Sequence, residues 1–518
     1  MKPKSLKRKL DGTQKIKSER KKFEHMDLYR KTPLMGWASW NYCRTNISES
    51  KMKTQMDALV STGLAECGYE YANLDDGFFG GRDENGRLLF NKERFPNGIK
   101  VLADYAHSLG LKAGIYSEGG DNTCGFLYDN EGANGTGVGL YGHEEQDLNM
   151  FLDEFGFDFI KVDWCGGLRL GLDEETQYTK IGKIIDEIRH RTNRQLVFNV
   201  CRWQFPGAWV VNVADSWRTG ADINPNFPSV MYQVDSIKPL ARYCGPGHVN
   251  DLDMMQIGNG LTLTEEKTHF SMWCMMSTPL MLGCDLTKLS EATLNIIKNK
   301  ELIAIDQDEA CLQAFPIKDW HSEKGKLLAE IWIKDLGKKH SNQKAIAFVN
   351  RSTEPITLDL KAEEAGLTGQ ILSVRDLWTH EELPCINEFS VTVQPHDVVI
   401  YKVESESSVE VVNQWDQGEV EFVATNKISM ETAMELVKEG AVLIDVRSTE
   451  EYEQKHLEGA LNYPYSVLDS MAGAVVPDRH TAIVVYCSTG KRSSQAKNLM
   501  ETNGFDNVYF LGGVEDLG

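Results

Sequence analysis

The chain has 518 residues, of which 41% are hydrophobic and 25% charged, and its formal net charge is −21. This length predicts roughly three domains of about 150 residues each, and the composition excludes collagen-like and largely disordered proteins. The negative charge argues against general nucleic-acid binding, which needs a basic face. The longest uncharged stretch, 270–284, is interrupted by Pro279 and is shorter than the roughly 20 residues that span a membrane. We therefore expect a soluble protein with neither nucleic acid nor a membrane as partner.

A strongly basic segment opens the chain. Between Lys2 and Lys22, ten basic residues accompany only two acidic ones, Asp11 and Glu19. No apolar run follows, so no secretory signal is predicted; residues 1–30 are interpreted as a solvated tail, with an interaction arm as the alternative. Eleven cysteines in a chain of this length are far below the density of a disulfide scaffold. The expected location is the cytoplasm, with mostly free thiols.

From residue 31 to residue 317, short β-rich runs alternate with amphipathic helical stretches. In 99–109 the apolar residues recur at three- and four-residue spacing, which predicts a helix with one buried face, and 175–191 follows the same pattern. The β-rich runs lie at 33–37, 69–74, 112–116, 158–162, 196–200, 216–218, 247–249 and 279–282. Eight such alternations predict an α/β fold, a (β/α)8 TIM barrel over residues 31–317.

Charged side chains gather where the predicted strands end. They include Asp75, Asp76, Glu118, Asp163, Arg202, Arg218, Asp222, Asp251 and Asp253. Because barrel active sites form at the carboxyl ends of the strands, this placement favours an active site over scattered surface carboxylates. Tryptophans such as Trp40, Trp164 and Trp203 lie at the same ends. Paired acids with tryptophans suggest sugar chemistry, although a single Trp is more often part of a core.

Beyond the barrel the pattern changes twice. Five β-rich runs, at 327–333, 344–350, 356–360, 371–376 and 391–402, predict a C-terminal antiparallel β-sandwich over 318–403. Residues 404–426 are acidic and contain serines, which is typical of a linker. Residues 427–518 alternate strands (442–446, 483–486) with helices (429–438, 492–503), which predicts a small α/β domain.

Residues 31–316 resemble glycoside hydrolase family 27, the α-galactosidase and α-N-acetylgalactosaminidase family. Ordered matches include Thr-Pro-Leu-Met-Gly-Trp at 32–37, Lys-Val-Asp at 161–163 and Asn-Asp-Leu-Asp-Met at 250–254. The family also carries a C-terminal β-sandwich. The resemblance implies a retaining double displacement in which Asp163 is the nucleophile and Asp222 the general acid/base.

The same resemblance implies a set of sugar-binding residues. They are Trp40, Asp75, Asp76, Tyr116, Lys161, Arg218 and Asp253. In the family the two adjacent aspartates and the lysine hold the 4- and 6-hydroxyls, and a cation beside the nucleophile keeps it ionised. Cys124 and Cys165 match a disulfide pair of the family, whereas a cytoplasmic setting favours thiols at these positions.

One position departs from the family pattern. Cys201-Arg202-Trp203 stands where many α-galactosidases have Cys-Glu-Trp, and that glutamate contacts the 2-hydroxyl of the sugar. A guanidinium cannot accept a hydrogen bond, so the contact at the 2-position must differ. We expect Arg202 to donate to the 2-substituent or, as the alternative, to turn away and pair with a neighbouring carboxylate.

The segment Cys487 to Ser493 follows a predicted strand and opens a predicted helix. Backbone N–H groups at such a turn converge on the sulfur and lower the pKa of the thiol. Residues 427–518 resemble a single rhodanese domain, with Asp-Val-Arg at 445–447 as a further match. Four residues, the last of them Lys491, separate Cys487 from Arg492, whereas a tyrosine-phosphatase loop has five. This spacing favours sulfur over phosphate chemistry and implies a sulfur donor or acceptor as partner.

Together these features predict a retaining glycoside hydrolase that cleaves terminal α-galactosyl residues from small oligosaccharides and carries a sulfurtransferase-like module. One alternative keeps the barrel but changes the substrate to an α-N-acetylgalactosaminide, a β-L-arabinopyranoside or an α-glucan. Another is a non-catalytic sugar-binding or scaffold protein, against which the joint presence of Asp163, Lys161 and Asp222 argues. No metal and no organic cofactor is predicted.

Overall fold

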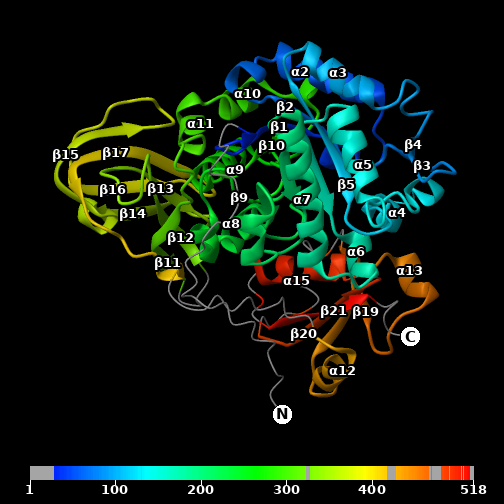
Figure 1. The fold of residues 1–518 in the computed structure, drawn as a ribbon. Coiled ribbons are helices and arrows are strands. Elements are labelled where there is room, and N and C mark those ends of the chain that lie inside the picture. Colours follow the sequence, from blue (N-terminus) through cyan, green and yellow to red (C-terminus); the bar gives the residue numbers. More distant parts are fainter. Residues whose placement is uncertain are drawn as a thin grey trace. The chain divides into compact units, whose positions relative to one another are not determined.

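The computed structural model describes residues 28–129, 131–322, 327–416, 428–465, 480–488, 490–502 and 507–513, together with Leu468, Val476 and Phe505 (Figure 1). Residues 1–27 of the predicted tail and 417–426 of the predicted linker lie outside the described residues. The chain divides into two units, one holding the barrel and the sandwich and the other the C-terminal domain. Each is described by itself.

Eight parallel strands form the barrel. They are β1 (Met35–Ala38), β2 (Tyr71–Leu74), β5 (Lys112–Glu118), β6 (Phe159–Asp163), β7 (Val197–Val200), β8 (Ser216–Arg218), β9 (Val249–Asp251) and β10 (Leu280–Leu282). The strand order is β10-β1-β2-β5-β6-β7-β8-β9, and a parallel bridge between Met255, just after β9, and Leu282 of β10 closes the ring. Each strand overlaps one of the eight predicted runs, so the predicted barrel is confirmed.

Helices follow the strands and cover the barrel (Figure 1). They are α1 (Trp40–Cys43), α2 (Glu49–Ser61), α3 (Lys100–Ser108), α4 (Cys124–Tyr128), α5 (Glu144–Leu148), α6 (Cys165–Arg169), α7 (Glu174–Thr192), α8 (Phe227–Ser236), α9 (Leu263–Met276), α10 (Glu291–Ile297) and α11 (Lys300–Asp306). A small hairpin, β3 (Phe79–Arg82) with β4 (Leu88–Phe90), follows β2. Side-chain caps set where the longer helices begin: Ser48 for α2, Asp173 for α7 and a capping box of Thr262 and Glu265 for α9.

The β-sandwich consists of a five-stranded and a two-stranded antiparallel sheet. The first, in the order β11-β12-β13-β17-β15, contains β11 (Phe315–His321), β12 (Leu327–Asp335), β13 (Gln343–Asn350), β17 (Val398–Ser408) and β15 (Leu367–Asp376). The second pairs β14 (Ile356–Lys361) with β16 (Glu388–Val393). Ile331, Phe348, Leu358 and Val391 lie in the core between them. The predicted antiparallel sandwich is confirmed.

Two details of the sandwich differ from the sequence expectation. The predicted run 391–402 is two strands, because a turn at 394–397, in which His396 has φ +56°, separates β16 from β17. Strand β17 also continues to Ser408, five residues into the predicted linker, because 404–408 keep pairing with β15. Serines and glutamates on an exposed strand resemble a linker in composition, which explains the difference.

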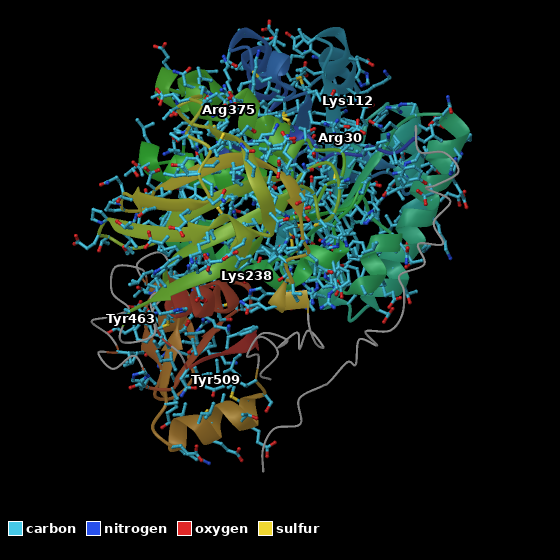
Figure 2. The ribbon with its side chains drawn as sticks, turned by 90° about the vertical axis from the view of Figure 1, so that its left-hand side faces the viewer. Arg30, Lys112, Lys238, Arg375, Tyr463 and Tyr509 are labelled. Atoms are coloured by element: carbon cyan, nitrogen blue, oxygen red, sulfur yellow. A yellow bond between two sulfur atoms is a disulfide. The ribbon has the colours of Figure 1, made fainter. Side chains whose placement is uncertain are left out.

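Ion pairs attach the sandwich to the barrel. Lys238 lies 2.6 Å from Glu330 of β12, and Arg375 of β15 lies 2.7 Å from Glu301 of α11; both basic residues are labelled in Figure 2. Lys334 of β12 is fully buried and donates to the Cys274 and Ile305 carbonyl oxygens. These contacts fix the sandwich against helices on the outside of the barrel.

The C-terminal unit contains a four-stranded parallel sheet in the order β19-β18-β20-β21. Its elements are α12 (Met430–Lys438), β18 (Val442–Asp445), α13 (Thr449–Gln454), β19 (Leu461–Asn462), β20 (Ile483–Cys487), α15 (Lys491–Thr502) and β21 (Val508–Gly513). Ile444, Val485 and Phe510 belong to one of its cores. The predicted small α/β domain is confirmed. Within the described ranges of the whole chain, no helix has the length and apolar character to cross a membrane.

Candidate active site

Asp163 is the last residue of β6, and Lys161 precedes it by two positions. Side chains two residues apart on a strand point to the same side, so both reach the carboxyl-end interior of the barrel. The Asp163 carboxylate accepts a hydrogen bond of 3.0 Å from the Trp164 N–H and is 5% exposed. Lys161 Nζ lies 2.9 Å from Asp75 Oδ2. The structure thus brings Asp75, Lys161 and Asp163 together from the ends of β2 and β6, the two strands on either side of β5.

Asp75 and Asp76 follow β2 directly. The Ser39 hydroxyl accepts from the Asp75 N–H at 2.9 Å, which ties this turn to the end of β1. The Asp76 carboxylate is buried and accepts from the Gly125 N–H at 2.7 Å, so α4 holds it in place. Burial raises the pKa of Asp76 to about 7.

Arg218, at the end of β8, lies between two carboxylates. Its guanidinium is 2.9 Å from Asp253 Oδ2 and 3.3 Å from Asp222 Oδ1. The Asp222 side chain is 24% exposed, against 7% for Asp253. Burial raises the pKa of Asp253 to about 6, and the negative charge of Asp222 adds to this effect. Asp222 is therefore the carboxylate of this group that can exchange a proton with solvent.

Arg202 pairs with a neighbouring carboxylate through its Nε. Its Nε lies 2.8 Å from Oε2 of Glu174, the first residue of α7, and both side chains are largely buried. The preceding residue, Cys201, has its sulfur 3.9 Å from a nitrogen of Arg218. Arg202 is therefore anchored to α7 at the rim of the same site.

The two aromatic candidates also lie at strand ends. Trp40 begins α1 and is 8% exposed, and the Arg44 guanidinium lies 4.3 Å from the centre of its ring. Tyr116 of β5 is fully buried, and its hydroxyl accepts from the Cys124 N–H at 3.3 Å. Lys161 Nζ is 5.5 Å from the centre of the Tyr116 ring.

A cavity of about 50 Å³ lies inside the barrel among these residues. Its lining includes five of the predicted sugar-binding residues, Asp75, Tyr116, Lys161, Arg218 and Asp253. Apolar side chains, among them Phe159 and Met254, complete the wall. Carboxylates that accept, cations that donate and an apolar wall are the groups that bind a sugar, because its hydroxyls lie at the rim of an apolar ring face.

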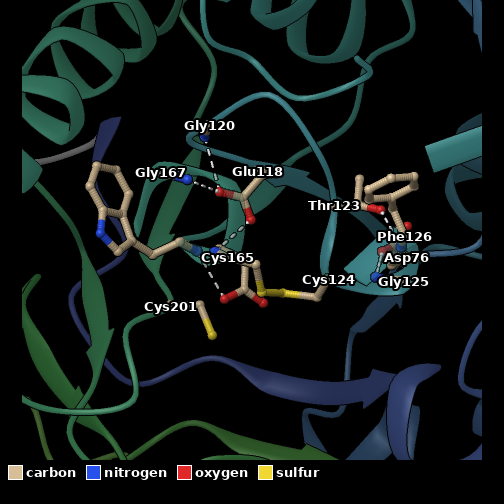
Figure 3. The surroundings of a disulfide bond; sticks show 12 residues. Asp76, Glu118, Gly120, Thr123, Cys124, Gly125, Phe126, Cys165, Gly167 and Cys201 are labelled. Atoms are coloured by element: carbon tan, nitrogen blue, oxygen red, sulfur yellow. Dashed lines mark hydrogen bonds between the residues drawn. A yellow bond between two sulfur atoms is a disulfide. The ribbon is translucent and has the colours of Figure 1, made fainter. Parts of the chain in front are cut away.

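A disulfide joins Cys124 at the start of α4 to Cys165 at the start of α6, with 5.5 Å between their Cα atoms (Figure 3). The family resemblance implies this pair, whereas the predicted cytoplasmic setting favours free thiols at these positions. The two helix starts face each other across the loops that follow β5 and β6, and this geometry brings the sulfurs together. The other nine cysteines of the chain are free.

In the C-terminal domain, backbone N–H groups surround the sulfur of Cys487, as its sequence indicates. Cys487, at the end of β20, is buried, and its sulfur accepts from the Gly490 N–H at 3.1 Å and the Ser493 N–H at 3.3 Å. Arg492 forms two bonds of 2.6 and 2.7 Å to Glu451 of α13, and the bond to Arg492 is the main reason that the pKa of Glu451 falls to about 2. Lys491 begins α15.

Comparison with known proteins assigns all three parts of the chain. A family described as Alpha galactosidase A matches residues 32–308, its C-terminal β-sandwich domain matches 328–403, and the rhodanese-like domain matches 429–517. An α-galactosidase A from Cellvibrio japonicus is 36% identical over 412 residues, which cover 75% of this chain and 95% of that protein. The chain belongs to the α-galactosidase family.

Two further relatives of this family agree over the same region. An α-galactosidase from Oryza sativa is 36% identical over 376 residues, covering 72% of this chain and 84% of that protein. The crystal structure of α-galactosidase I from Mortierella vinacea superposes with a TM-score of 0.64 at 27% identity, covering 73% of this chain and 98% of that one. The α-galactosidase relatives therefore account for the barrel and the sandwich, and the rhodanese-like domain is an addition.

Proposed function

We propose that the barrel hydrolyses terminal α-galactosyl residues of small oligosaccharides with retention of configuration. The observation that carries this proposal is the placement of Asp163 on the same strand face as Lys161, which itself pairs with Asp75, in a chain of the α-galactosidase family. In the first step Asp163 attacks the anomeric carbon while Asp222 protonates the leaving oxygen. In the second step Asp222 deprotonates a water that releases the sugar from Asp163.

The charges around the site suit these two roles. The nucleophile must be ionised, and Lys161 on the same strand face favours the charged form of Asp163. Arg218 has Asp253 as its nearer partner at 2.9 Å and Asp222 at 3.3 Å, so its charge is shared between the two. The more exposed Asp222 is placed to exchange protons with a leaving oxygen and with water.

The sugar specificity follows from two residues that line the cavity, Asp75 and Lys161, together with Asp76 beside Asp75. Asp75, Asp76 and Lys161 supply acceptors and a donor for the 4- and 6-hydroxyls, as the family resemblance implies. An axial 4-hydroxyl is selected when its partners are buried and fixed, because a sugar that lacks it leaves them unpaired. The Lys161–Asp75 pair and the bond from Gly125 to Asp76 provide this rigidity.

A panel of nitrophenyl glycosides tests the proposal on the purified full chain. We expect the highest kcat/KM with the α-galactoside. Faster turnover of the α-N-acetylgalactosaminide, the β-L-arabinopyranoside or an α-glucoside would change the proposed substrate but leave the proposed mechanism as it is. Galactose binding without turnover of any substrate would instead support a sugar-binding protein.

We further propose that Arg202 contacts the substituent at the 2-position. Its bond to Glu174 uses the Nε–H, and a guanidinium carries four more N–H donors. The replacement Arg202→Met is expected to change the ratio of kcat/KM between α-galactoside and its 2-acetamido analogue by about tenfold or more. Glu174→Gln, which loosens the anchor but keeps the arginine, should shift the ratio less and in the same direction. An unchanged ratio in both variants would mean that Arg202 does not take part in substrate recognition.

For the C-terminal domain we propose sulfur transfer at Cys487. The thiolate takes the outer sulfur of thiosulfate, which releases sulfite and leaves a persulfide, and cyanide then removes that sulfur as thiocyanate. Cys487→Ser is expected to abolish thiocyanate formation and to leave α-galactoside hydrolysis within about twofold of the parent chain. Asp163→Asn provides the reverse control, with sulfur transfer retained. Loss of both activities in either variant would contradict separate sites.

A further inference from the structure

Glu118 is a buried carboxyl that the mechanism above does not use. It is the last residue of β5 and has no exposed surface. Its Oε1 accepts from the Gly120 N–H at 3.0 Å and from the Gly167 N–H at 3.2 Å, and its Oε2 accepts from the Cys165 N–H at 2.9 Å (Figure 3). One side chain thus joins the loop after β5 to the loop after β6.

The loop after β6 follows Asp163 directly and continues into the first turn of α6, which begins at Cys165. In the β5–β6 register Glu118 is the direct partner of Asp163, and the Gly119 N–H donates to the Asp163 carbonyl oxygen at 2.9 Å. An oxygen of the Glu118 carboxyl and an oxygen of the Asp163 carboxylate lie within 4.8 Å of each other. Glu118 is therefore beside the proposed nucleophile but bonds to the backbone that follows it.

The two loops pack backbone against backbone, which leaves room for no other side chain between them. A Cβ built on Gly120 would lie 2.1 Å from the carbonyl carbon of Gly166, and one built on Gly166 would lie 2.7 Å from the Asn122 carbonyl oxygen. In this dry contact the N–H groups of Cys165 and Gly167 depend on a protein acceptor, because buried donors without partners are costly. Glu118 is the acceptor for both of these N–H groups.

The disulfide does not replace this function. It ties the side chain of Cys165 to that of Cys124, whereas Glu118 holds the backbone N–H groups of Cys165 and Gly167. The neighbouring N–H, that of Trp164, donates to Asp163 Oδ1. A rotation of the peptide planes between Asp163 and Cys165 would carry this donor away and release the carboxylate from its orientation.

We propose that Glu118 is a positioning residue for the glycosidase reaction: by holding the backbone after Asp163 through the N–H groups of Cys165 and Gly167, it fixes the carboxylate of Asp163 for attack on the sugar. The proposal rests on the nucleophile role of Asp163 given above. Positioning acts on the chemical step, because a misplaced nucleophile loses rate even when the sugar still binds.

The test measures the attack directly on the full chain. The probe is 5-fluoro-α-galactosyl fluoride, which transfers its sugar to the nucleophile and releases fluoride. In Glu118→Gln one oxygen becomes an amide donor that cannot accept from the backbone. We expect the rate constant of fluoride release in the first turnover to fall by about 10- to 100-fold, and the Kd for galactose to change by less than about threefold.

Glu266→Gln is the matched control. Glu266 is also buried and accepts from a backbone N–H, that of Gly258 at 2.7 Å, but it holds the loop after β9. This variant should lose thermal stability without slowing the first turnover. A parent-like rate in Glu118→Gln, a loss that falls on galactose affinity, or equal losses in the two variants would overturn the proposal.

Glu118→Asp covers the case in which Glu118→Gln does not fold. It keeps both carboxylate oxygens and draws them back by one methylene. We expect a rate between those of Glu118→Gln and the parent chain, and a rate within twofold of the parent would overturn the proposal. Failure of the proposed function is recognised separately. If mass spectrometry locates the sugar label on a residue other than Asp163, Asp163 is not the nucleophile, and Glu118 has no nucleophile of this kind to position.

Discussion

Asp163→Asn is expected to lower kcat/KM for α-galactosides by at least about 10³-fold while the protein remains folded. An amide cannot form the covalent intermediate of a retaining hydrolase, so the double displacement loses its first step. Asparagine has nearly the same shape, and its oxygen can still accept from the Trp164 N–H, which donates to Asp163 at 3.0 Å. The measurement compares initial rates with nitrophenyl α-galactoside, and thermal unfolding verifies the fold.

Azide, tested on the related variant Asp163→Ala, provides a control for the nucleophile assignment. In Asp163→Ala a small anion can enter the vacated space and attack the anomeric carbon from the side that Asp163 occupies. A single displacement inverts the configuration, so the expected product is β-galactosyl azide. Near-normal hydrolysis by a folded Asp163→Asn, or azide adducts of the α configuration from Asp163→Ala, would contradict the nucleophile assignment.

The barrel could be predicted from sequence because its strands are short apolar runs that end in polar residues. Parallel strands buried on both faces read as continuous hydrophobic segments, and Pro-Leu-Met-Leu at 279–282 is an example. The boundaries were less certain. Strand β1 begins at Met35 rather than residue 33, and the predicted run 391–402 contains a turn, because Pro395 and His396 lie within a segment of otherwise strong β composition.

The pairing of charged side chains was harder to predict than their positions. The strand-end pattern indicates Asp75, Lys161 and Asp163, and these lie together because the parallel strands β2 and β6, which flank β5, end at the same side of the sheet. The partner of Arg202 is Glu174, the first residue of α7, and no periodicity links positions 28 apart in sequence. Such a contact depends on how the loop after β7 lies against the start of α7.

Glu118 shows a different limit. The sequence Ser117-Glu118-Gly119-Gly120 marks a strand end followed by a close backbone approach, and the acid was visible at that end. Two of its partners are backbone N–H groups at the start of α6, which carry no sequence signal of their own. An acidic strand-end residue followed by two glycines is the one feature that could have indicated this role.

The second large effect is expected for Asp222→Ala, and it should depend on the leaving group. General acid catalysis contributes roughly 10²- to 10⁴-fold, and its weight grows as the leaving oxygen becomes more basic. For a galactosyl oligosaccharide we expect kcat/KM to fall by about 10³-fold. For nitrophenyl α-galactoside or galactosyl fluoride the fall should be about tenfold or less, because these groups leave without protonation.

The comparison uses kcat/KM because this quantity reports the first displacement. The second displacement also loses its base in Asp222→Ala, so kcat for activated substrates should fall and KM should fall with it as the galactosyl-enzyme accumulates. Azide needs no general base, so it should restore turnover and give α-galactosyl azide, the anomer opposite to that from Asp163→Ala. Equal losses of kcat/KM across leaving groups, or the same azide anomer from both variants, would mean that Asp222 and Asp163 do not hold opposite faces of the sugar.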